Sequence, residues 1–326
     1  MDEFGGKWPA GMGNCGQEVV STMRNRALIP WFQRPASKVL IRRAANYEQE
    51  LETLIYESLV EFALPVKDKV VLLKPNFVGP DPGGIRNTHP AVIGATRASF
   101  LRLGASHVWI GDGPALDRDT EAILESIRLR DFVGPLARTF VDLNLDEVER
   151  VPLATKASRL KELYFPKTVL GADLVVSMPK LKTHHWAGVT LSLKNMFGTV
   201  PGSCYGWPKN VLHWAGIDNA ILDINAAVRP DFAIVDGIMG MEGNGPIQGT
   251  PKACGALIFG DDPVAVDATC CRLMGLLPEK VKYLAAAGTM LGHIRVDRIQ
   301  QVGESVAALR TRFSVIREFD AIRDAA

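Results

Sequence analysis

Residues 172–202 read ADLVVSMPKLKTHHWAGVTLSLKNMFGTVPG. The stretch opens with an apolar run, Leu174 to Val176, and turns polar after Pro179. This order predicts a buried strand that ends in a cluster of cations and imidazoles, followed by a helix. Lysine and histidine normally weaken a core, so their presence here indicates that something binds. The candidate residues of this stretch are Lys180, Lys182, His184, His185, Lys194 and Asn195.

The segments before this stretch alternate between strand and helix patterns. Residues 70–78 read VVLLKPNFV and predict a strand, residues 91–103 predict a helix, and residues 107–111 read HVWIG and predict a second strand. A strand, a helix and a strand in this order form a crossover unit whose strands are parallel. We therefore predict an α/β protein with a Rossmann-like parallel sheet core, a second, partly inserted α/β lobe, and a cleft between them.

The Gly- and Pro-rich start of the chain, residues 1–36, is interpreted as an irregular N-terminal arm. An α/β domain is predicted over residues 37–310, with two lobes at about 37–145 and 146–310. Within it, residues 148–166 alternate between apolar and polar and predict two exposed antiparallel strands. The glycine-rich residues 237–251 are open to two interpretations, a flexible lid or a long structural loop. Residues 311–326 are taken as a C-terminal tail.

Five of the predicted strands share a feature: each is apolar and is followed by polar residues. In a parallel sheet the carboxyl ends of the strands lie along one edge, and ligands bind in the crevice there. We therefore expect the following side chains to converge. They are Lys74, Asn76, Asp112, Lys180, Lys182, His184, His185, Asp236, Asp261 and Asp262.

Composition excludes several classes of protein. The chain has 326 residues, and its 37 Lys plus Arg nearly balance its 36 Asp plus Glu, so we expect no nucleic-acid partner. Its five cysteines lack CxxC spacing, so we expect neither a disulfide scaffold nor an iron–sulfur cluster, and we expect a cytoplasmic protein. No apolar run approaches the roughly 20 residues that cross a bilayer, so no membrane partner is expected. A homodimer is left open.

The lysines and asparagines predict a site for a small anion. Lysine neutralises a carboxylate or phosphate, and asparagine supplies amide donors. The alternative is that individual lysines pair with Asp112 or Asp236. The predicted substrate-binding residues are Lys74, Asn76, Lys180, Lys182, Asn195 and Asn244.

The histidines leave two interpretations open. His184, His185 and His213, with Asp236 or Glu242, are the ligand types of a divalent iron or zinc site. The alternative has no metal, with one structural histidine and another acting as a general acid or base. The predicted metal ligands are His184, His185, His213 and Glu242, and the predicted catalytic residues are Lys194, His184, His213 and Asp236.

Several pieces of the sequence together resemble the family named domain of unknown function 362. They are VLLKPNFV with THP, VWIGDGP, DLVVSMPKLKTHHWAGVTLSLKNMFG, NVLHWAGIDNAILDI, IVDGIMGMEGNGPIQGTP and GDDPVAVDA, and they span about residues 38–290. Relatives in this family often carry a ferredoxin-type cluster domain. This chain lacks the cysteine motif of that domain.

A more distant resemblance concerns the nickel-pincer lactate racemases. In HHWAGVTLSLK, His184 precedes Lys194 by ten residues, as a histidine precedes the lysine that attaches the pincer nucleotide there, and His213 lies downstream. The glycine-rich segment between the two is replaced by residues 188–192, GVTLS. The resemblance implies shared ancestry of the core, and we expect no nickel-pincer nucleotide.

Taken together, the sequence predicts an enzyme that acts on a small carboxylate-type organic anion with a divalent metal, iron being preferred to zinc. Redox chemistry, C–C or C–H bond chemistry, and isomerisation all suit such a site. The alternative is a non-catalytic protein that binds a metal or cofactor or serves as an electron-transfer partner.

Overall fold

The computed structural model describes residues 36–81, 83–115, 119–155 and 157–325. The predicted N-terminal arm, apart from Ala36, lies outside the described residues.

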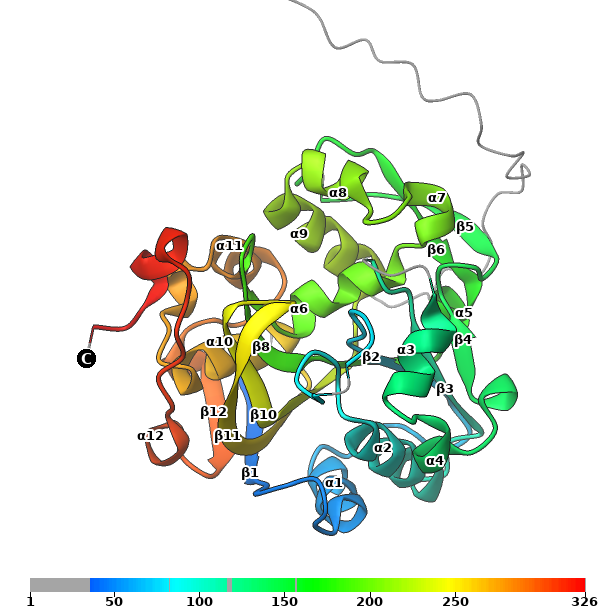
Figure 1. Cartoon of the computed structure of the whole chain (residues 1–326), viewed down its shortest axis with the longest axis horizontal. Helices are drawn as coiled ribbons and strands as arrows, with labels where there is room; N and C mark the ends of the chain where they lie inside the picture. Colours follow the sequence, from blue (N-terminus) through cyan, green and yellow to red (C-terminus); the bar gives the residue numbers. More distant parts are fainter. Residues whose placement is uncertain (1–35, 82, 116–118, 156, 326) are drawn as a thin grey trace, which may run out of the picture.

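A large mixed sheet forms the centre of the protein (Figure 1). Its strands follow the order β12-β1-β11-β10-β7-β2-β3-β4, and β8 pairs with β10 while β9 pairs with β8. Neighbours are parallel except where β11 meets β1 and β10, and where β9 meets β8. The bounds are β1 Ser37–Arg43, β2 Val70–Pro75, β3 His107–Asp112, β4 Phe140–Asp142, β7 Leu174–Met178, β8 Lys180–His184, β9 Gly188–Thr190, β10 Phe232–Asn244, β11 Gln248–Gly260 and β12 Ile299–Gly303.

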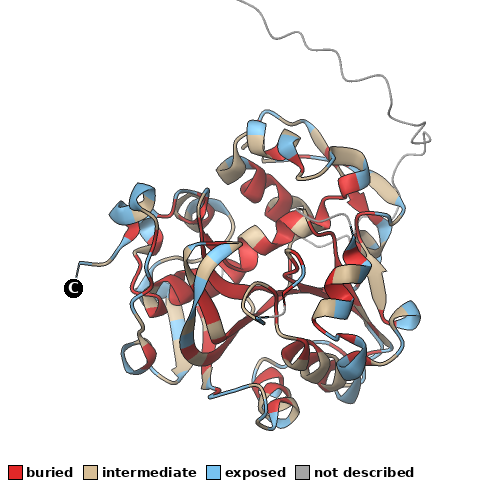
Figure 2. Ribbon diagram, viewed as in Figure 1, coloured by how far each residue is buried: buried red, intermediate tan, exposed pale blue. Residues whose placement is uncertain are grey.

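Helices cover both faces of the sheet. Successive side chains of a strand point to opposite faces of the sheet, and each face packs against its own apolar core. In β2, Leu72 packs with one core, and its neighbours Val71 and Leu73 pack with the other. Figure 1 shows α1, α2 and α4 grouped on one side of the sheet, and Figure 2 shows the strands as the most continuously buried part. The longer helices are α1 Leu51–Val60, α2 Pro90–Arg102, α3 Thr120–Ser126, α9 Ile217–Val228, α10 Pro263–Leu273 and α11 Lys282–Met290; the short ones are α4 Arg130–Val133, α5 Lys167–Gly171, α6 Ser192–Asn195, α7 Gly202–Tyr205, α8 Asn210–Trp214 and α12 Val306–Leu309.

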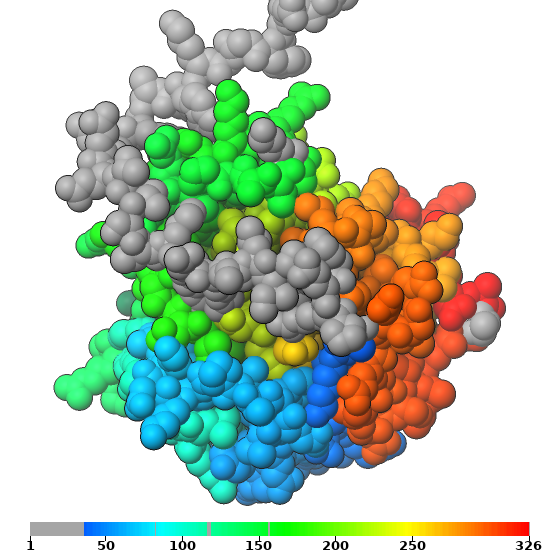
Figure 3. Space-filling model, turned by 180° about the vertical axis from the view of Figure 1, so that it is seen from behind, coloured from blue at the N-terminus to red at the C-terminus, as the bar shows by residue number. Residues whose placement is uncertain are grey.

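The predicted α/β fold with a mostly parallel sheet is confirmed. The predicted antiparallel pair is also confirmed, as β5 (Val148–Pro152) and β6 (Glu162–Pro166) form a separate two-stranded sheet. Seen from behind, the C-terminal part of the chain lies beside the first strand (Figure 3), as the pairing of β12 with β1 requires. Residues 311–325 pack onto the body through Phe313, Val315 and Ile322. Among the described helices, none combines the length and apolar character that crossing a bilayer requires.

The direction of β11 corrects one expectation. Because β11 runs antiparallel to β10, its carboxyl end lies at the opposite edge of the sheet from the carboxyl ends of β2, β3 and β7. Asp262, which follows β11, therefore does not join the other polar strand ends. Its side chain instead accepts hydrogen bonds from the backbone of Val264 and Ala265 and caps α10.

The interpretation of residues 237–251 as a long structural loop was wrong, whereas the flexible lid stays a prediction. These residues form most of a hairpin, because β10 continues to Asn244 and β11 begins at Gln248. The glycines allow this hairpin to lie close to β8: a Cβ atom on Gly240 would fall 2.7 Å from the carbonyl oxygen of Leu181. Glycine density here reflects close backbone approach, which sequence alone does not separate from flexibility.

Because both faces of the sheet are buried, the stability of the fold should depend strongly on the apolar side chains of β11. Phe259 is fully buried, whereas Phe132 is 45% exposed. We expect Phe259→Ala to lower the free energy of unfolding by about 3–5 kcal/mol, because it leaves a cavity in the core. The matched variant Phe132→Ala should lower it by less than about 1 kcal/mol. Urea unfolding followed by circular dichroism measures both values, and equal losses would contradict the described packing.

Candidate functional site

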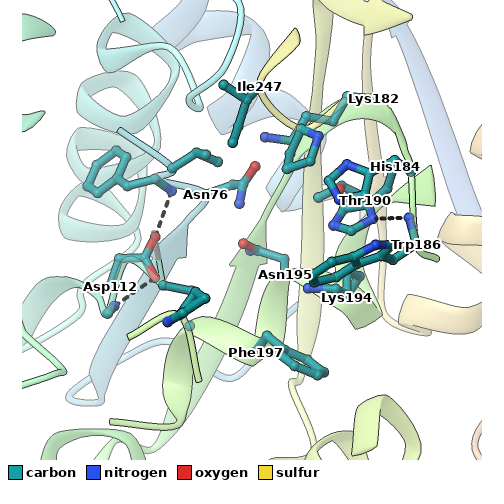
Figure 4. A pocket seen from close by; sticks show the side chains of 18 of the residues that line it. Asn76, Asp112, Lys182, His184, Trp186, Thr190, Lys194, Asn195, Phe197 and Ile247 are labelled. Carbon is teal, nitrogen blue, oxygen red and sulfur yellow. Dashed lines mark hydrogen bonds between the residues drawn. The ribbon is translucent and has the colours of Figure 1, made fainter. Parts of the chain in front are cut away.

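A cavity of about 170 Å³ lies where the carboxyl ends of β2 and β3 face β8, β9, α6 and α8. Figure 4 shows side chains from these separate segments pointing toward one another. Eight of the predicted site residues line the cavity: Lys74, Asn76, Lys182, His184, His185, Lys194, Asn195 and His213. Further lining residues include Phe77, Asp112, Trp186, Thr190, Phe197 and Ile247.

A buried ion pair holds one wall of the cavity. Nζ of Lys74 lies 2.5 Å from Oδ1 of Asp112, and both side chains are 1% exposed. Asp112 also accepts hydrogen bonds from the backbone N–H of Phe77 at 2.7 Å and of Gly113 at 2.8 Å. Burial lowers the pKa of Lys74, and the charge of Asp112 opposes that shift. The pair therefore fixes the loops after β2 and β3, and Lys74 has little capacity left for a substrate.

Asn195 is fixed by the same network. Its Oδ1 accepts from Nζ of Lys74 at 3.1 Å, and its Nδ2 donates to the carbonyl oxygen of Lys74 and to Oγ of Ser177. A side chain on Gly198 would displace this arrangement, since its Cβ would lie 2.5 Å from Nζ of Lys74. Asn195 thus lines the cavity, but its amide already makes three hydrogen bonds within the protein.

Two other lysines in the cavity have no carboxylate partner among the described residues. Nζ of Lys182 donates to the carbonyl oxygen of Arg86 at 2.6 Å, and burial, followed by the charge of Lys180, lowers its pKa far below the ordinary value. Nζ of Lys194 lies 4.0 Å from the centre of the Phe197 ring, and burial and the charge of Lys74 lower its pKa to about 7. An anion in the cavity would raise both pKa values and favour the cationic form of these amines.

A further lysine was missed by sequence reasoning. Lys209 is fully buried, and its Nζ donates to the carbonyl oxygen of Gly113 at 2.8 Å. Burial lowers its pKa to about 7. Its backbone is left-handed, at φ 65°, and the sequence around it carries no pattern that indicates either this conformation or this contact. Lys209 supports the loop after β3 from behind the cavity.

The three histidines are held in defined tautomers by the backbone. Nδ1 of His184 accepts hydrogen bonds from the N–H groups of Trp186 and Ala187, so its proton is on Nε2. Nδ1 of His213 lies 3.2 Å from the carbonyl oxygen of Lys209, which only accepts, so Nδ1 carries the proton and Nε2 is the free acceptor. His185 is held in the same way by the carbonyl oxygen of Gly245 at 2.7 Å. The site thus offers one N–H donor and two acceptors.

The charges of two of these rings follow from their surroundings. Burial, followed by the charge of Lys194, lowers the pKa of His184 far below its ordinary value and that of His213 to about 4. Both rings are therefore neutral at pH 7 while the cavity holds no anion. A neutral imidazole presents a donor N–H on one ring nitrogen and an acceptor lone pair on the other.

Two buried polar atoms in the lining have no hydrogen-bond partner among the described residues. They are Oδ1 of Asn76 and Oγ1 of Thr190. Leaving a buried polar atom unpaired costs about 1–3 kcal/mol, so such atoms are rare unless a ligand or water completes them. Both atoms therefore indicate that the cavity binds a polar molecule.

Four predicted site residues do not line the cavity. Lys180 and Asp236 form a second buried ion pair, with Nζ and Oδ2 2.9 Å apart, and Tyr47 bonds to both. Glu242 accepts from the backbone N–H of Ser314. Asn244 donates to Gln248 across the end of the hairpin. Asp236 lies inside β10 rather than at its end, because the strand continues through the glycines that follow it.

The predicted metal ligands are consequently not assembled. Among the described residues, no three His, Cys, Asp or Glu side chains are grouped as a metal site requires. Glu242 lies apart from the histidines, and the Nε2 atom of His184 carries a proton. His185 and His213 are the predicted ligands in the cavity whose Nε2 atoms are free to bind a metal. The iron or zinc ion stays a prediction.

Comparisons with known proteins place the chain in a family and say little about chemistry. The model of the family described as domain of unknown function (DUF362) matches residues 71–272. A thylakoid-associated protein of Synechocystis sp. is 32% identical over 225 residues, which are 66% of this chain and 66% of that protein. The match therefore covers just under two thirds of the relative's length.

Two solved structures show a weaker likeness. The lactate racemase apoprotein from Thermoanaerobacterium thermosaccharolyticum has 15% identity and a TM-score of 0.44, over 72% of this chain and 57% of that one. A Thermotoga maritima protein has 15% identity and a TM-score of 0.42, over 70% and 59%. The family resemblance that the sequence indicated is confirmed by the match of the family model over residues 71–272.

Removing one partner of the buried ion pair should destabilise the protein far more than removing one partner of an exposed ion pair. Asp112→Asn leaves Lys74 buried without its counter-charge, so we expect a loss of about 3–5 kcal/mol in the free energy of unfolding. The control is Asp297→Asn, which removes an exposed partner of Arg295 and should leave the unfolding midpoint almost unchanged. Denaturant unfolding of both variants checks this expectation. Similar losses would show that the Lys74–Asp112 pair does not stabilise the fold.

The lowered pKa of Lys194 predicts that anion binding depends on pH. Below about pH 7 this amine is already cationic, whereas above it the amine must take up a proton when an anion binds. The affinity for malonate, used as a probe, should therefore fall as the pH rises from about 6 to about 9. Lys194→Arg keeps its charge over this range and should give a shallower dependence. Titration calorimetry measures both, and equal slopes would contradict the assignment.

Proposed function

The chain belongs to the DUF362 family, and we propose that its cavity is the active site of an enzyme that moves a proton at a carbon atom of a small organic anion. The observation that carries the proposal is the pairing of two kinds of group in one cavity. Lys182 and Lys194 are amines that have no carboxylate partner among the described residues and become cationic when an anion binds, and His184 and His213 are neutral imidazoles fixed in opposite tautomers. Such a set binds negative charge and exchanges protons.

The size of the cavity limits the substrate. About 170 Å³ is well below the roughly 300–1,000 Å³ of sites that take drug-sized ligands. A carboxylate bound to Lys182 would supply the negative charge that this buried side chain lacks. Asn76, whose Oδ1 has no partner in the described residues, would bond a donor group on the same ligand. We therefore propose a small carboxylate as the substrate.

The tautomers assign the roles of the two histidines. Nε2 of His213 is the acceptor that would remove a proton, and the Nε2–H of His184 is the donor that would stabilise an oxygen gaining negative charge. Bound anion raises the pKa of His213, because it offsets the charge of Lys194 that helps to lower that pKa in the empty cavity. The base thus becomes stronger when substrate is present.

This proposal uses the chain's own residues and needs no metal to bind the substrate. The sequence predicts an iron or zinc ion at His184, His185, His213 and Glu242; of these residues, His185 and His213 have Nε2 atoms that could hold it, and the ion would supply a Lewis acid in place of the His213 base. A non-catalytic binding protein is the alternative. It would bind the same anion in the same cavity but would not exchange a proton with it.

Proton exchange at carbon is the test. The protein is incubated in D₂O with a panel of small 2-hydroxy and 2-oxo carboxylates, and loss of the proton signal at the carbon beside the carboxylate or carbonyl group is followed by NMR. We expect exchange for at least one compound, and a loss of about 100-fold or more with His213→Gln, because this change removes the base. The control His107→Gln changes a histidine at the start of β3, outside the cavity.

Two outcomes would overturn the proposal. Binding of these carboxylates without exchange would favour the non-catalytic alternative. Exchange that survives in His213→Gln would assign the proton transfer to another group.

A further inference from the structure

We infer that the substrate carries a carbonyl group and that Lys194 forms a Schiff base with it, so that the site takes small oxo carboxylates. The inference rests on the proposed function, and it assigns to Lys194 a covalent role that charge neutralisation alone does not require.

The argument begins with the contacts of the cavity lysines. Lys74 is paired with Asp112, and Lys182 donates to the carbonyl oxygen of Arg86. In the part of the chain that the structure describes, Nζ of Lys194 has neither a hydrogen-bond nor an ion-pair partner, and it lies against the Phe197 ring at 4.0 Å. An amine packed on an apolar ring and open to a cavity is placed to attack a ligand rather than to hold the fold.

The short helix α6 presents this amine on a fixed support. The buried carboxylate of Asp267 accepts hydrogen bonds from the backbone N–H of Ser192 at 2.7 Å and of Leu193 at 3.0 Å. The amide of Asn195, on the other side of Lys194, is bonded to Lys74 and Ser177. Lys194 is therefore flanked by anchored residues, which is the pre-organisation that a nucleophile needs.

The electrostatics support the same role. Burial and the nearby charge of Lys74 lower the pKa of Lys194 to about 7, so a large fraction of the amine is neutral at pH 7 and has a free lone pair. Desolvation in an apolar setting and a second cation nearby are the two ways in which proteins activate lysine as a nucleophile.

The chemistry of the step balances without any other reagent. The lone pair of Nζ adds to the carbonyl carbon and forms a C–N bond, while the carbonyl oxygen takes up a proton. This proton is one of the two on the amine, so the resulting carbinolamine has one N–H left; its hydroxyl group leaves with that remaining proton as water, and a C=N double bond remains. The Nε2–H of His184 can donate to the departing oxygen, and Nε2 of His213 can accept the amine proton.

The arrangement of the cavity defines the class of ligand. Figure 4 shows His184 and Thr190 between Lys182 and Lys194, so the two lysines face different parts of the cavity. A ligand with a carboxylate for Lys182 and a carbonyl carbon for Lys194 satisfies both. Oγ1 of Thr190, which has no partner among the described residues, would bond a polar atom between them. A small oxo acid has these two groups within a few bonds.

Reductive trapping tests the inference on the full chain. The protein is incubated at pH 7 with glyoxylate or pyruvate and sodium cyanoborohydride, which reduces a C=N bond to a stable secondary amine. Intact mass should show one adduct per chain, and peptide mapping should place it on Lys194. Lys69, an exposed lysine paired with Asp173, is the internal control and should remain largely unmodified. Because this mapping uses the unaltered protein, it does not depend on the folding of a variant.

The variant Lys194→Arg separates charge from nucleophilicity. It should still bind malonate, measured by calorimetry, and should form no trapped adduct. An adduct that forms no faster on Lys194 than on Lys69, or that forms on Lys182 instead, would overturn the inference. If carboxylates bind and exchange protons without trapping, the Schiff base fails and the proposed function stands. If no carboxylate binds, both fail.

Discussion

The buried pair of Lys74 and Asp112 is the interaction on which the site depends. Both side chains are almost fully removed from water, and a lone charge in such a place would be strongly destabilising. Asp112 ties the end of β3 to the backbone of Phe77 after β2, and Lys74 orients Asn195 at the end of α6. One ion pair thus sets the positions of three segments that are far apart in the sequence.

The chemistry of the cavity follows from which of its lysines are paired with a carboxylate. Asp112 neutralises Lys74, and Asp236 neutralises Lys180 in a second buried pair. In the part of the chain that the structure describes, Lys182 and Lys194 have no carboxylate partner; Lys182 donates to a backbone carbonyl oxygen and Lys194 lies on the Phe197 ring. Burial, followed by the charge of Lys194, lowers the pKa of His184, and burial, followed by the charge of Lys74, lowers the pKa of Lys194. An anion would reverse these shifts, so binding and protonation are coupled in this site.

Backbone geometry determines the form of the imidazoles. In each of the three histidines Nδ1 is bonded to a backbone group and Nε2 is left for a ligand. A donor N–H at His184 and an acceptor at His213 therefore exist before any substrate arrives. Pre-oriented groups of this kind do not have to reorganise during a reaction, which is the main advantage of a protein site over water.

The sequence by itself determined the alternation of strands and helices, and with it the parallel sheet and the placement of Lys74, Lys182, His184 and Lys194 near one edge. These follow from local periodicity and from the shared direction of parallel strands. Tertiary structure decided which charges cancel and which stay free. Asp236 lies within a strand that the sequence suggested would end there, and β11 reverses direction and carries Asp262 away from the cavity. Thr190 lines the cavity and Lys209 supports the loop after β3 behind it, and no local pattern encodes such contacts because they depend on the packing of the whole chain.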